Sequence, residues 1–149
     1  MKRMLLVGLF LIIGGAHAQS TDRPLMLVAA PGVQGLYSRT AVIVLPFADR
    51  HFGFIVNRAT DTTLARLFPE HPPSAKVVDP VHFGGPERVN ALFAIVRHNP
   101  GAQAMPLFAG LHLVSQASAI DRVIEQNPGD ARFFAGFVAW QPGELEKEI

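Results

Sequence analysis

The segment from Ala131 to Trp140 constrains this fold more than any other part of the chain. It is the longest strand candidate, and its apolar side chains fall on both faces of an extended backbone. Strands that are buried on both faces lie in the middle of a sheet. The sequence therefore predicts a central strand, which ends at Trp140 because Gln141 is followed by Pro142-Gly143.

Shorter apolar and β-branched runs predict the rest of the sheet. Before the central strand, runs at 25–30, 39–47, 52–58, 91–97 and 111–114 are typical of strands, and 81–83 is extended up to a pair of glycines. The second and third runs flank a polar gap and predict a β-hairpin. With about six strands, three short helices and no βαβ alternation, the expected class is α+β.

Three short helices are predicted by apolar spacing and by residues typical of helix ends. Asp61 is the expected N-cap of the first helix, and either Ser115 or Ser118 caps the second. A third helix is expected to begin at Pro142, since proline suits the first helical position. The expected buried faces are Leu64, Leu67 and Phe68 in the first helix, and Ile120, Val123 and Ile124 in the second.

Length and composition indicate one packed domain. The 149 residues are 49% apolar and 17% charged, which is typical of a globular core and not of disorder. The chain has no cysteine, so disulfides, thiolate catalysis and thiolate metal sites are excluded.

The N-terminal residues resemble an export signal. Lys2 and Arg3 precede an apolar run, and Ala16-His17-Ala18 has the small-x-small pattern of a cleavage site. We expect residues 1–18 to be a signal peptide cleaved between Ala18 and Gln19, residues 19–149 to be one domain, and the product to be periplasmic or secreted. No stable membrane span is expected after cleavage. An uncleaved anchor and a cytoplasmic protein are the alternatives.

Charge argues against nucleic acid as a partner. Without residues 1–18 the chain carries eleven basic and twelve acidic residues, a formal charge of −1. A nearly neutral surface provides no basic field for phosphates. The expected partner is therefore a protein or a small anionic ligand.

The segment His82-Phe83-Gly84-Gly85-Pro86 is the first candidate site. Tandem glycines let another group approach the backbone closely, and their N–H groups can bind an anion or form an oxyanion hole. The structural alternative is a tight turn at the end of a strand. No Gly-x-Ser-x-Gly motif accompanies the glycines, so no catalytic residue is predicted.

Asn57, Arg58 and Trp140 complete the set of candidate binding residues. The Arg58 guanidinium suits a carboxylate or phosphate, whereas Asn57 equally suits a hydrogen bond to the following turn. Trp140 either fills the core or lines a groove. No pair of histidines has the spacing of metal ligands, so neither a metal nor a cofactor is predicted.

Taken in order along the chain, several segments resemble the YqgE/AlgH family of bacterial proteins. They are Leu-Val-Ala-Ala-Pro-Gly-Val at 27–33, 41–43, Gly-Phe-Ile-Val-Asn-Arg at 53–58, 83–86 and 136–144. The resemblance implies an α+β fold with a mainly antiparallel, bifurcated sheet that forms a pseudo-barrel. It implies no catalytic residue or cofactor, because none is established for that family.

This chain departs from the family pattern at three places. It has an expected export signal, Gly35 stands near a position that is usually acidic, and the chain stops at Ile149 where relatives typically continue. We therefore expect a domain without the usual C-terminal extension.

Three functions follow from these observations. The first is a non-enzymatic binding or accessory protein of the cell envelope. The second is a hydrolase that uses the Gly84-Gly85 turn as an anion hole and His82 as general base. The third is a cytoplasmic regulator, as the family name suggests, although no helix-turn-helix pattern or basic stripe supports it.

Overall fold

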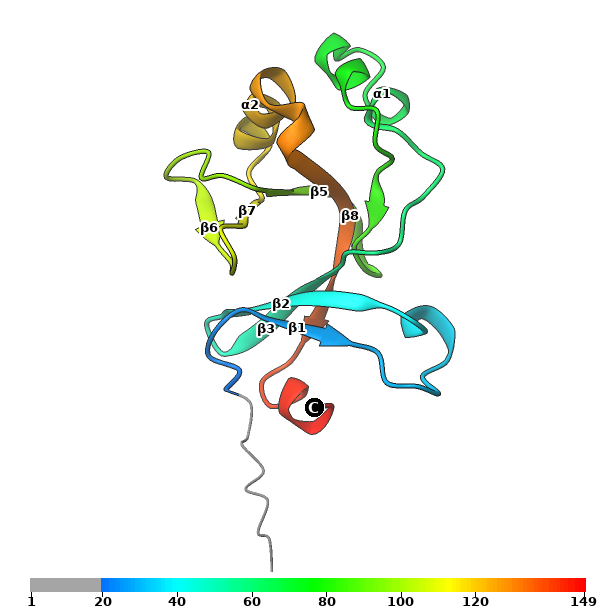
Figure 1. The fold of residues 1–149 in the computed structure, drawn as a ribbon, viewed down its shortest axis with the longest axis vertical. Coiled ribbons are helices and arrows are strands. Elements are labelled where there is room, and N and C mark those ends of the chain that lie inside the picture. The colour runs from blue at the N-terminus through cyan, green and yellow to red at the C-terminus, as the bar shows by residue number, and fades with distance from the viewer. Residues whose placement is uncertain (1–19) are drawn as a thin grey trace, which may run out of the picture.

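A computed structural model describes residues 20–149, so the predicted signal peptide and its cleavage site fall outside the described residues. This part of the chain forms a curled, mainly antiparallel sheet, a half-barrel with few helices (Figure 1). Its elements are β1 (Leu25–Val28), β2 (Ala41–Phe47), β3 (Arg50–Ile55), α1 (Leu64–Leu67), β4 (His82–Phe83), β5 (Glu87–Val96), β6 (Ala104–Pro106), β7 (His112–Val114), α2 (Ala117–Gln126) and β8 (Ala131–Trp140). The expected α+β class and antiparallel sheet agree with this arrangement.

Strand β8 lies at the centre of the sheet, as the sequence predicted. The strand order is β1-β2-β3-β8-β5-β7-β6, and every pair in this order is antiparallel. Figure 1 shows β8 running from the end that carries the helices to the end formed by β1, β2 and β3. One strand thereby joins two arms of the sheet, which we call the β1–β3 arm and the β5–β7 arm.

The short strand β4 occupies a fork between β3 and β8. It is parallel to β8, with His82 opposite Phe134. On its other side, the Phe83 N–H donates to the Arg58 carbonyl, and the Gly84 carbonyl accepts from the Ile55 N–H, both at 2.8 Å. Farther along, β3 pairs directly with β8, so the sheet divides where β4 begins.

The chain crosses β8 between β4 and β5, because these two strands pair with opposite edges of β8. Gly84 and Gly85 make the crossing directly against the backbone of Gly136 and Phe137. A Cβ on Gly84 would collide with the Gly136 carbonyl oxygen, and a Cβ on Gly136 would collide with the Gly85 carbonyl oxygen. Two backbones can approach this closely only where side chains are absent.

Gly136 also changes which face of β8 each side chain occupies. Its φ is +73°, a conformation that other residues rarely adopt. Before it, Phe133 packs with α2 and Phe134 faces the space between the arms. After it, Phe137 faces that same space and Val138 packs on the opposite side. The shift keeps Phe134 and Phe137 on one continuous apolar surface.

The core is divided into three clusters by the two faces of the curled sheet. The first lies beneath α1 and α2 and includes Leu64, Val96 and Ile124. The second lies on the outer face of the β1–β3 arm beneath Leu145. The third fills the concave side between the arms. Its buried members are Ile43, Leu45, Phe54, Ile95, Leu113 and Phe134.

The predicted N-caps were wrong in both α-helices. The N-cap of α1 is Thr63, whose side chain accepts from the Arg66 N–H, and not Asp61. The N-cap of α2 is Gln116, which makes no side-chain capping bond, and neither predicted serine holds that position. The expected buried face of α2 is confirmed, since Ile120, Val123 and Ile124 are all buried. That of α1 was wrong except at Leu64, because Leu67 and Phe68 are exposed.

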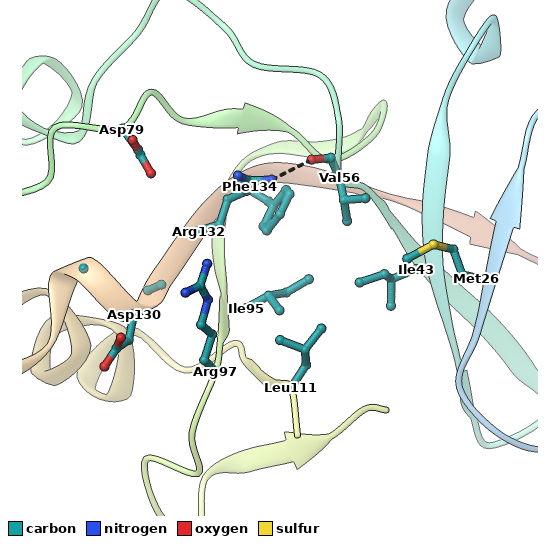
Figure 2. A pocket seen from close by; sticks show the side chains of 12 residues that line it. Met26, Ile43, Val56, Asp79, Ile95, Arg97, Leu111, Asp130, Arg132 and Phe134 are labelled. Atoms are coloured by element: carbon teal, nitrogen blue, oxygen red, sulfur yellow. Dashed lines mark hydrogen bonds between the residues drawn. The ribbon is translucent and has the colours of Figure 1, made fainter. Parts of the chain in front are cut away.

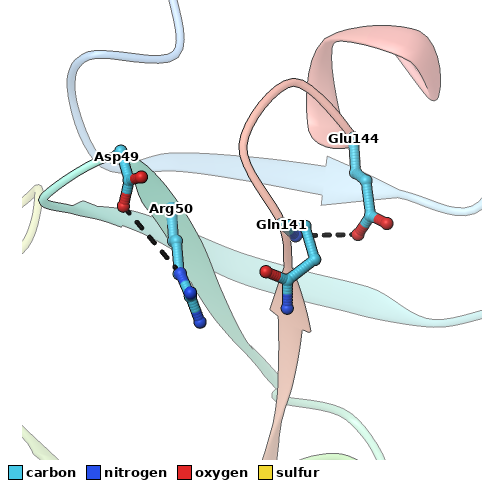
Figure 3. Close-up of polar contacts among 4 residues, drawn as sticks. All are labelled: Asp49, Arg50, Gln141 and Glu144. Atoms are coloured by element: carbon cyan, nitrogen blue, oxygen red, sulfur yellow. Dashed lines mark hydrogen bonds and ion pairs between the residues drawn. The ribbon is translucent and has the colours of Figure 1, made fainter.

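The third predicted helix was also wrong, because only a 3-10 helix at Leu145–Lys147 follows β8. The chain reverses direction first, and the Glu144 carboxylate accepts a 2.7 Å hydrogen bond from the Gln141 N–H (Figure 3). Figure 3 also shows the ion pair of Asp49 and Arg50 at the β2–β3 turn. The Arg50 Nε lies 3.9 Å from the Asp49 Oδ1. Both side chains are exposed, so this ion pair contributes little stability.

Two other details of the sheet differ from the sequence prediction. Strand β6 was not predicted, and the β2–β3 turn is tighter than the expected gap because Ala48 adopts a positive φ.

Within residues 20–149, no helix is long and apolar enough to cross a bilayer.

The backbone crossing predicts different costs for two glycine-to-alanine changes. Gly136→Ala introduces both a left-handed conformation and a collision with backbone, and we expect it to lower the free energy of unfolding by at least about 3 kcal/mol. Gly143→Ala is the matched control, because φ is +77° and its Cβ would meet nothing within 4 Å. It should cost only about 1–2 kcal/mol. Urea unfolding followed by Trp140 fluorescence measures both, and equal losses would contradict the crossing.

Candidate functional site

A pocket opens on the concave side of the sheet at the end nearest β1, with a volume of about 300 Å³. We call it the arginine pocket. Its floor is apolar and consists of Met26, Ile43, Val56, Ile95, Leu111 and Phe134. Its charged border consists of Asp79, Arg97, Asp130 and Arg132. Figure 2 shows Met26 and Ile43 across the pocket from the two arginines. Concave apolar surfaces with a few polar groups are typical of ligand sites.

The register of β5 and β8 brings the two arginines together. Ile95 lies directly opposite Arg132, and the Arg97 N–H donates to the Asp130 carbonyl at 3.1 Å. Opposite residues in an antiparallel pair share a face, and so do residues two apart on one strand. Arg97 and Arg132 are therefore diagonal neighbours on the concave face, on the same side of the pocket as Ile95 (Figure 2).

The guanidinium groups are only partly engaged by the protein. Arg132 donates to the Val56 carbonyl at 3.3 Å. Among residues 20–149, Arg97 makes no side-chain hydrogen bond and no ion pair, while Asp130 pairs with His98 at 3.4 Å. Neighbouring like charges on a sheet repel each other. An anion placed between these arginines would relieve that repulsion and accept charge-assisted hydrogen bonds.

Asn57 and Arg58, two of the predicted binding residues, hold the loop before β2. The Asn57 side chain accepts from the Ala41 N–H and donates to the Arg39 carbonyl, both at 2.9 Å. Arg58 donates to the Ser38 carbonyl at 3.2 Å. Arg39 has a φ of 56°, so these hydrogen bonds secure a strained segment.

In the predicted anion hole, both backbone groups of Gly84 are hydrogen-bonded to neighbouring strands. The Gly84 N–H donates to the Ala135 carbonyl at 2.8 Å, and the Gly84 carbonyl accepts from Ile55. His82 is buried, and its Nδ1 lies 3.1 Å from the Pro80 carbonyl. Burial lowers the pKa of His82, and the positive charge of Arg132 lowers it further. The neutral imidazole packs against the Phe134 ring.

Trp140 is in the core and not in a groove. It is 7% exposed, and its indole N–H donates to the Glu148 carboxylate at 2.9 Å. Its ring covers Gly53 so closely that a Cβ there would lie 2.8 Å from it. The hydrogen bond satisfies the only polar atom of a side chain that is otherwise apolar.

The structure does not gather the six predicted residues around one cavity. None of them lines the arginine pocket. Sequence reasoning missed Arg97 and Arg132, although each is a charged residue at the end of an otherwise apolar run. That signal was available, but it did not reveal that the two strand ends are neighbours.

A serine, a histidine and a glutamate outside the predicted site lie in the order of a hydrolase triad. The Ser74 hydroxyl is 2.8 Å from His71 Nδ1, and His71 Nε2 is 4.0 Å from the Glu125 carboxylate. Ser74 is fully buried at 0% exposure, so its hydroxyl is not accessible to a substrate. The contact instead joins residues at the start and middle of a 3-10 helix (Pro72–Lys76). Over residues 20–149, no group of three or more potential metal ligands is positioned around a common point.

Sequence comparison relates this chain to a family of bacterial proteins. A family model described as AlgH-like matches residues 26–149. A UPF0301 protein of Parabacteroides distasonis is 29% identical over 133 residues, which cover 83% of this chain and 65% of that protein. A UPF0301 protein of Nocardia farcinica is 30% identical, covering 84% of this chain and 61% of the relative. The chain thus spans less than two thirds of the length of these two relatives, 65% and 61%.

Two solved structures share the fold. The AlgH protein of Pseudomonas aeruginosa has a TM-score of 0.69 at 18% identity, covering 88% of this chain and 73% of that one. Protein DIP2367 of Corynebacterium diphtheriae has a TM-score of 0.67 at 23% identity, covering 85% and 70%. At these identities the likeness concerns the fold alone.

The surroundings of His82 predict a pH-dependent stability. Its pKa is lowered in the folded protein, so the unfolded chain binds the proton first as the pH falls. The neutral His82 therefore contributes its full stabilisation of the fold above about pH 6.5. This contribution is lost as the pH falls from that value through the lowered pKa of His82 in the folded protein. NMR titration should give a His82 pKa below its usual value. Arg132→Gln should raise that pKa, whereas Arg66→Gln should leave it unchanged. A His82 pKa at or above 6.5 in the unaltered protein would contradict this account.

Proposed function

The chain belongs to the AlgH-like family, and we propose that it is a non-enzymatic binding protein whose ligand places a negative group between Arg97 and Arg132. The observation that carries this proposal is that two arginines, diagonal neighbours on β5 and β8, border one apolar pocket, with Arg97 engaged by no other described side chain. The ligand is a small molecule that enters the arginine pocket from the concave side.

Electrostatics supports an anion at this position. Each arginine offers a planar fork of N–H groups that suits the two oxygens of a carboxylate. Arg132 is already oriented by its hydrogen bond to the Val56 carbonyl, which reduces the side-chain freedom lost on binding. Arg97 is exposed, and within residues 20–149 its guanidinium donates no hydrogen bond. The pocket is therefore partly organised before the ligand arrives.

A hydrolytic function receives less support from the same geometry. The Gly84 N–H, proposed as an anion-hole donor, is committed to the Ala135 carbonyl. His82 lies outside the lining of the arginine pocket, and the serine nearest to a triad arrangement is buried. Binding without chemistry accounts for the polar groups that do converge.

We further propose that the protein acts in the cell envelope. This proposal rests on the sequence of residues 1–18, whose positive start, apolar run and Ala16-His17-Ala18 pattern are typical of a cleaved export signal. A cytoplasmic regulator is the alternative that the family name suggests. The near-neutral charge of the remaining chain gives that alternative no support.

Removing one guanidinium should weaken the binding of an anionic probe. We expect Arg97→Gln to reduce the affinity for 1-anilinonaphthalene-8-sulfonate about tenfold, because a hydrogen bond to a charged group contributes about 1.5–3 kcal/mol. Fluorescence titration measures this affinity, and neutral Nile red controls for apolar binding. Arg66→Gln removes a charge from α1, outside the pocket, and should leave the affinity for the anionic probe unchanged. Equal affinities of both variants and the unaltered protein would refute the proposed site.

Export is tested separately by the mass and location of the protein. Expression from Met1 in a bacterium should yield a periplasmic product that begins at Gln19, measured by intact-mass spectrometry after cell fractionation. A full-length product in the cytoplasm would overturn the envelope role and leave the arginine pocket untouched.

A further inference from the structure

We propose that the ligand of the arginine pocket is a monocarboxylate with a medium-length apolar chain, of the fatty-acid type. This inference rests on the proposed function, and it specifies which anion the pocket selects. The carboxylate lies between Arg97 and Arg132, and the chain covers the apolar floor beneath them.

The floor of the pocket calls for an apolar chain beside the charged group. Ile43, Ile95 and Phe134 form its base and are already nearly fully buried. The apolar surface that a ligand can cover therefore belongs to the partly exposed Val56, Leu111 and Met26. Met26 stands above them on the edge strand β1 and is 46% exposed, so a large apolar side chain borders the opening. Inorganic anions would leave this surface in water. An alkyl chain would bury it, and the affinity would rise with each methylene that leaves water.

The charges around the pocket favour a single negative charge on the ligand. Two carboxylates, Asp79 and Asp130, border the same opening as the two guanidinium groups, so the formal charges of the lining cancel. Asp130 also lies 3.4 Å from His98, which is positive only when protonated. A dianionic phosphate would gain from the arginines but would be repelled by both aspartates. A carboxylate carries one negative charge, which the two nearby guanidinium groups are sufficient to balance.

The length of the chain is limited by aromatic rings that join the two arms. Phe54 of the β1–β3 arm lies 5.1 Å from Phe93 and 6.1 Å from Phe134, measured between ring centroids. These contacts fill the middle of the concave side and separate the arginine pocket from a second, aromatic-lined pocket near Phe137. With about 300 Å³ available, the site is at the small end of ligand pockets, which favours a medium chain over a long one.

Calorimetric titration of the purified protein at pH 8 with three probes tests this inference. Decanoate combines both features, decan-1-ol has the chain without the charge, and acetate has the charge without the chain. We expect decanoate to bind at least about tenfold more tightly than either of the other probes, since the charged contact and the buried chain each contribute more than 1.4 kcal/mol.

Matched variants separate the two halves of the site. Arg97→Gln should reduce the preference for decanoate over decan-1-ol about tenfold. Met26→Thr should weaken decanoate severalfold, because it removes apolar surface while keeping a residue that suits a strand. Val28→Thr is its control, since Val28 lies two residues along β1, is 73% exposed and does not line the pocket. It should bind decanoate as the unaltered protein does.

The possible contrary outcomes point to different errors. Acetate or inorganic phosphate binding as tightly as decanoate would overturn the fatty-acid inference and leave the proposed anion site standing. Decan-1-ol binding as tightly as decanoate would overturn both, because the arginines would then have no role. An equal loss of decanoate affinity in Met26→Thr and Val28→Thr would show that the alkyl chain does not bind in the arginine pocket. Absence of decanoate binding would refute the inference outright.

Discussion

The close passage of Gly84 and Gly85 over Gly136 is the constraint on which the rest of this structure depends. It carries the chain from one edge of β8 to the other, so that β4 and β5 flank the same strand. The crossing places Glu87 opposite Phe137, and an irregularity between Glu87 and Leu92 then shifts the register, so that Leu92 lies opposite Ala135 and Val96 opposite Ala131. Arg97 consequently ends beside Asp130 and diagonal to Arg132. The arginine pocket thus depends on the glycine crossing together with this register shift, although none of the three glycines lines it.

The same crossing explains why an open concave surface exists. Gly136 shifts the alternation of side chains along β8, so that Phe134 and Phe137 both face the space between the arms. Phe54 and Phe93 then bridge the arms near the middle, which leaves pockets on either side of a filled centre. A sheet that closed completely would have buried this surface. The half-barrel leaves an apolar floor within reach of solvent, with charged strand ends at its border.

The sequence predicted the elements whose physical signal is local, and it failed where the deciding contacts are distant. The bounds of β8 were predicted correctly because a long run with apolar residues on both faces has few alternatives. Strand β6 escaped prediction because its three residues include a proline and depend on pairing with β7. The caps of α1 and α2 were misplaced, since several polar residues precede each helix and local sequence does not choose between them. The diagonal placement of Arg97 and Arg132 was beyond sequence reasoning, because β5 and β8 are not consecutive and their register shifts between Glu87 and Leu92.

The central claim is that Arg97 and Arg132 together hold a negatively charged group, and arginine side-chain NMR tests it most directly. The Nε–Hε signals of ¹⁵N-labelled protein would be followed as decanoate is added, with Arg66 on α1 as an internal reference. The account predicts that the Arg97 and Arg132 signals shift together and saturate at one common affinity, while that of Arg66 does not move. Shifts confined to other residues, or unchanged Arg97 and Arg132 signals at saturating decanoate, would contradict it.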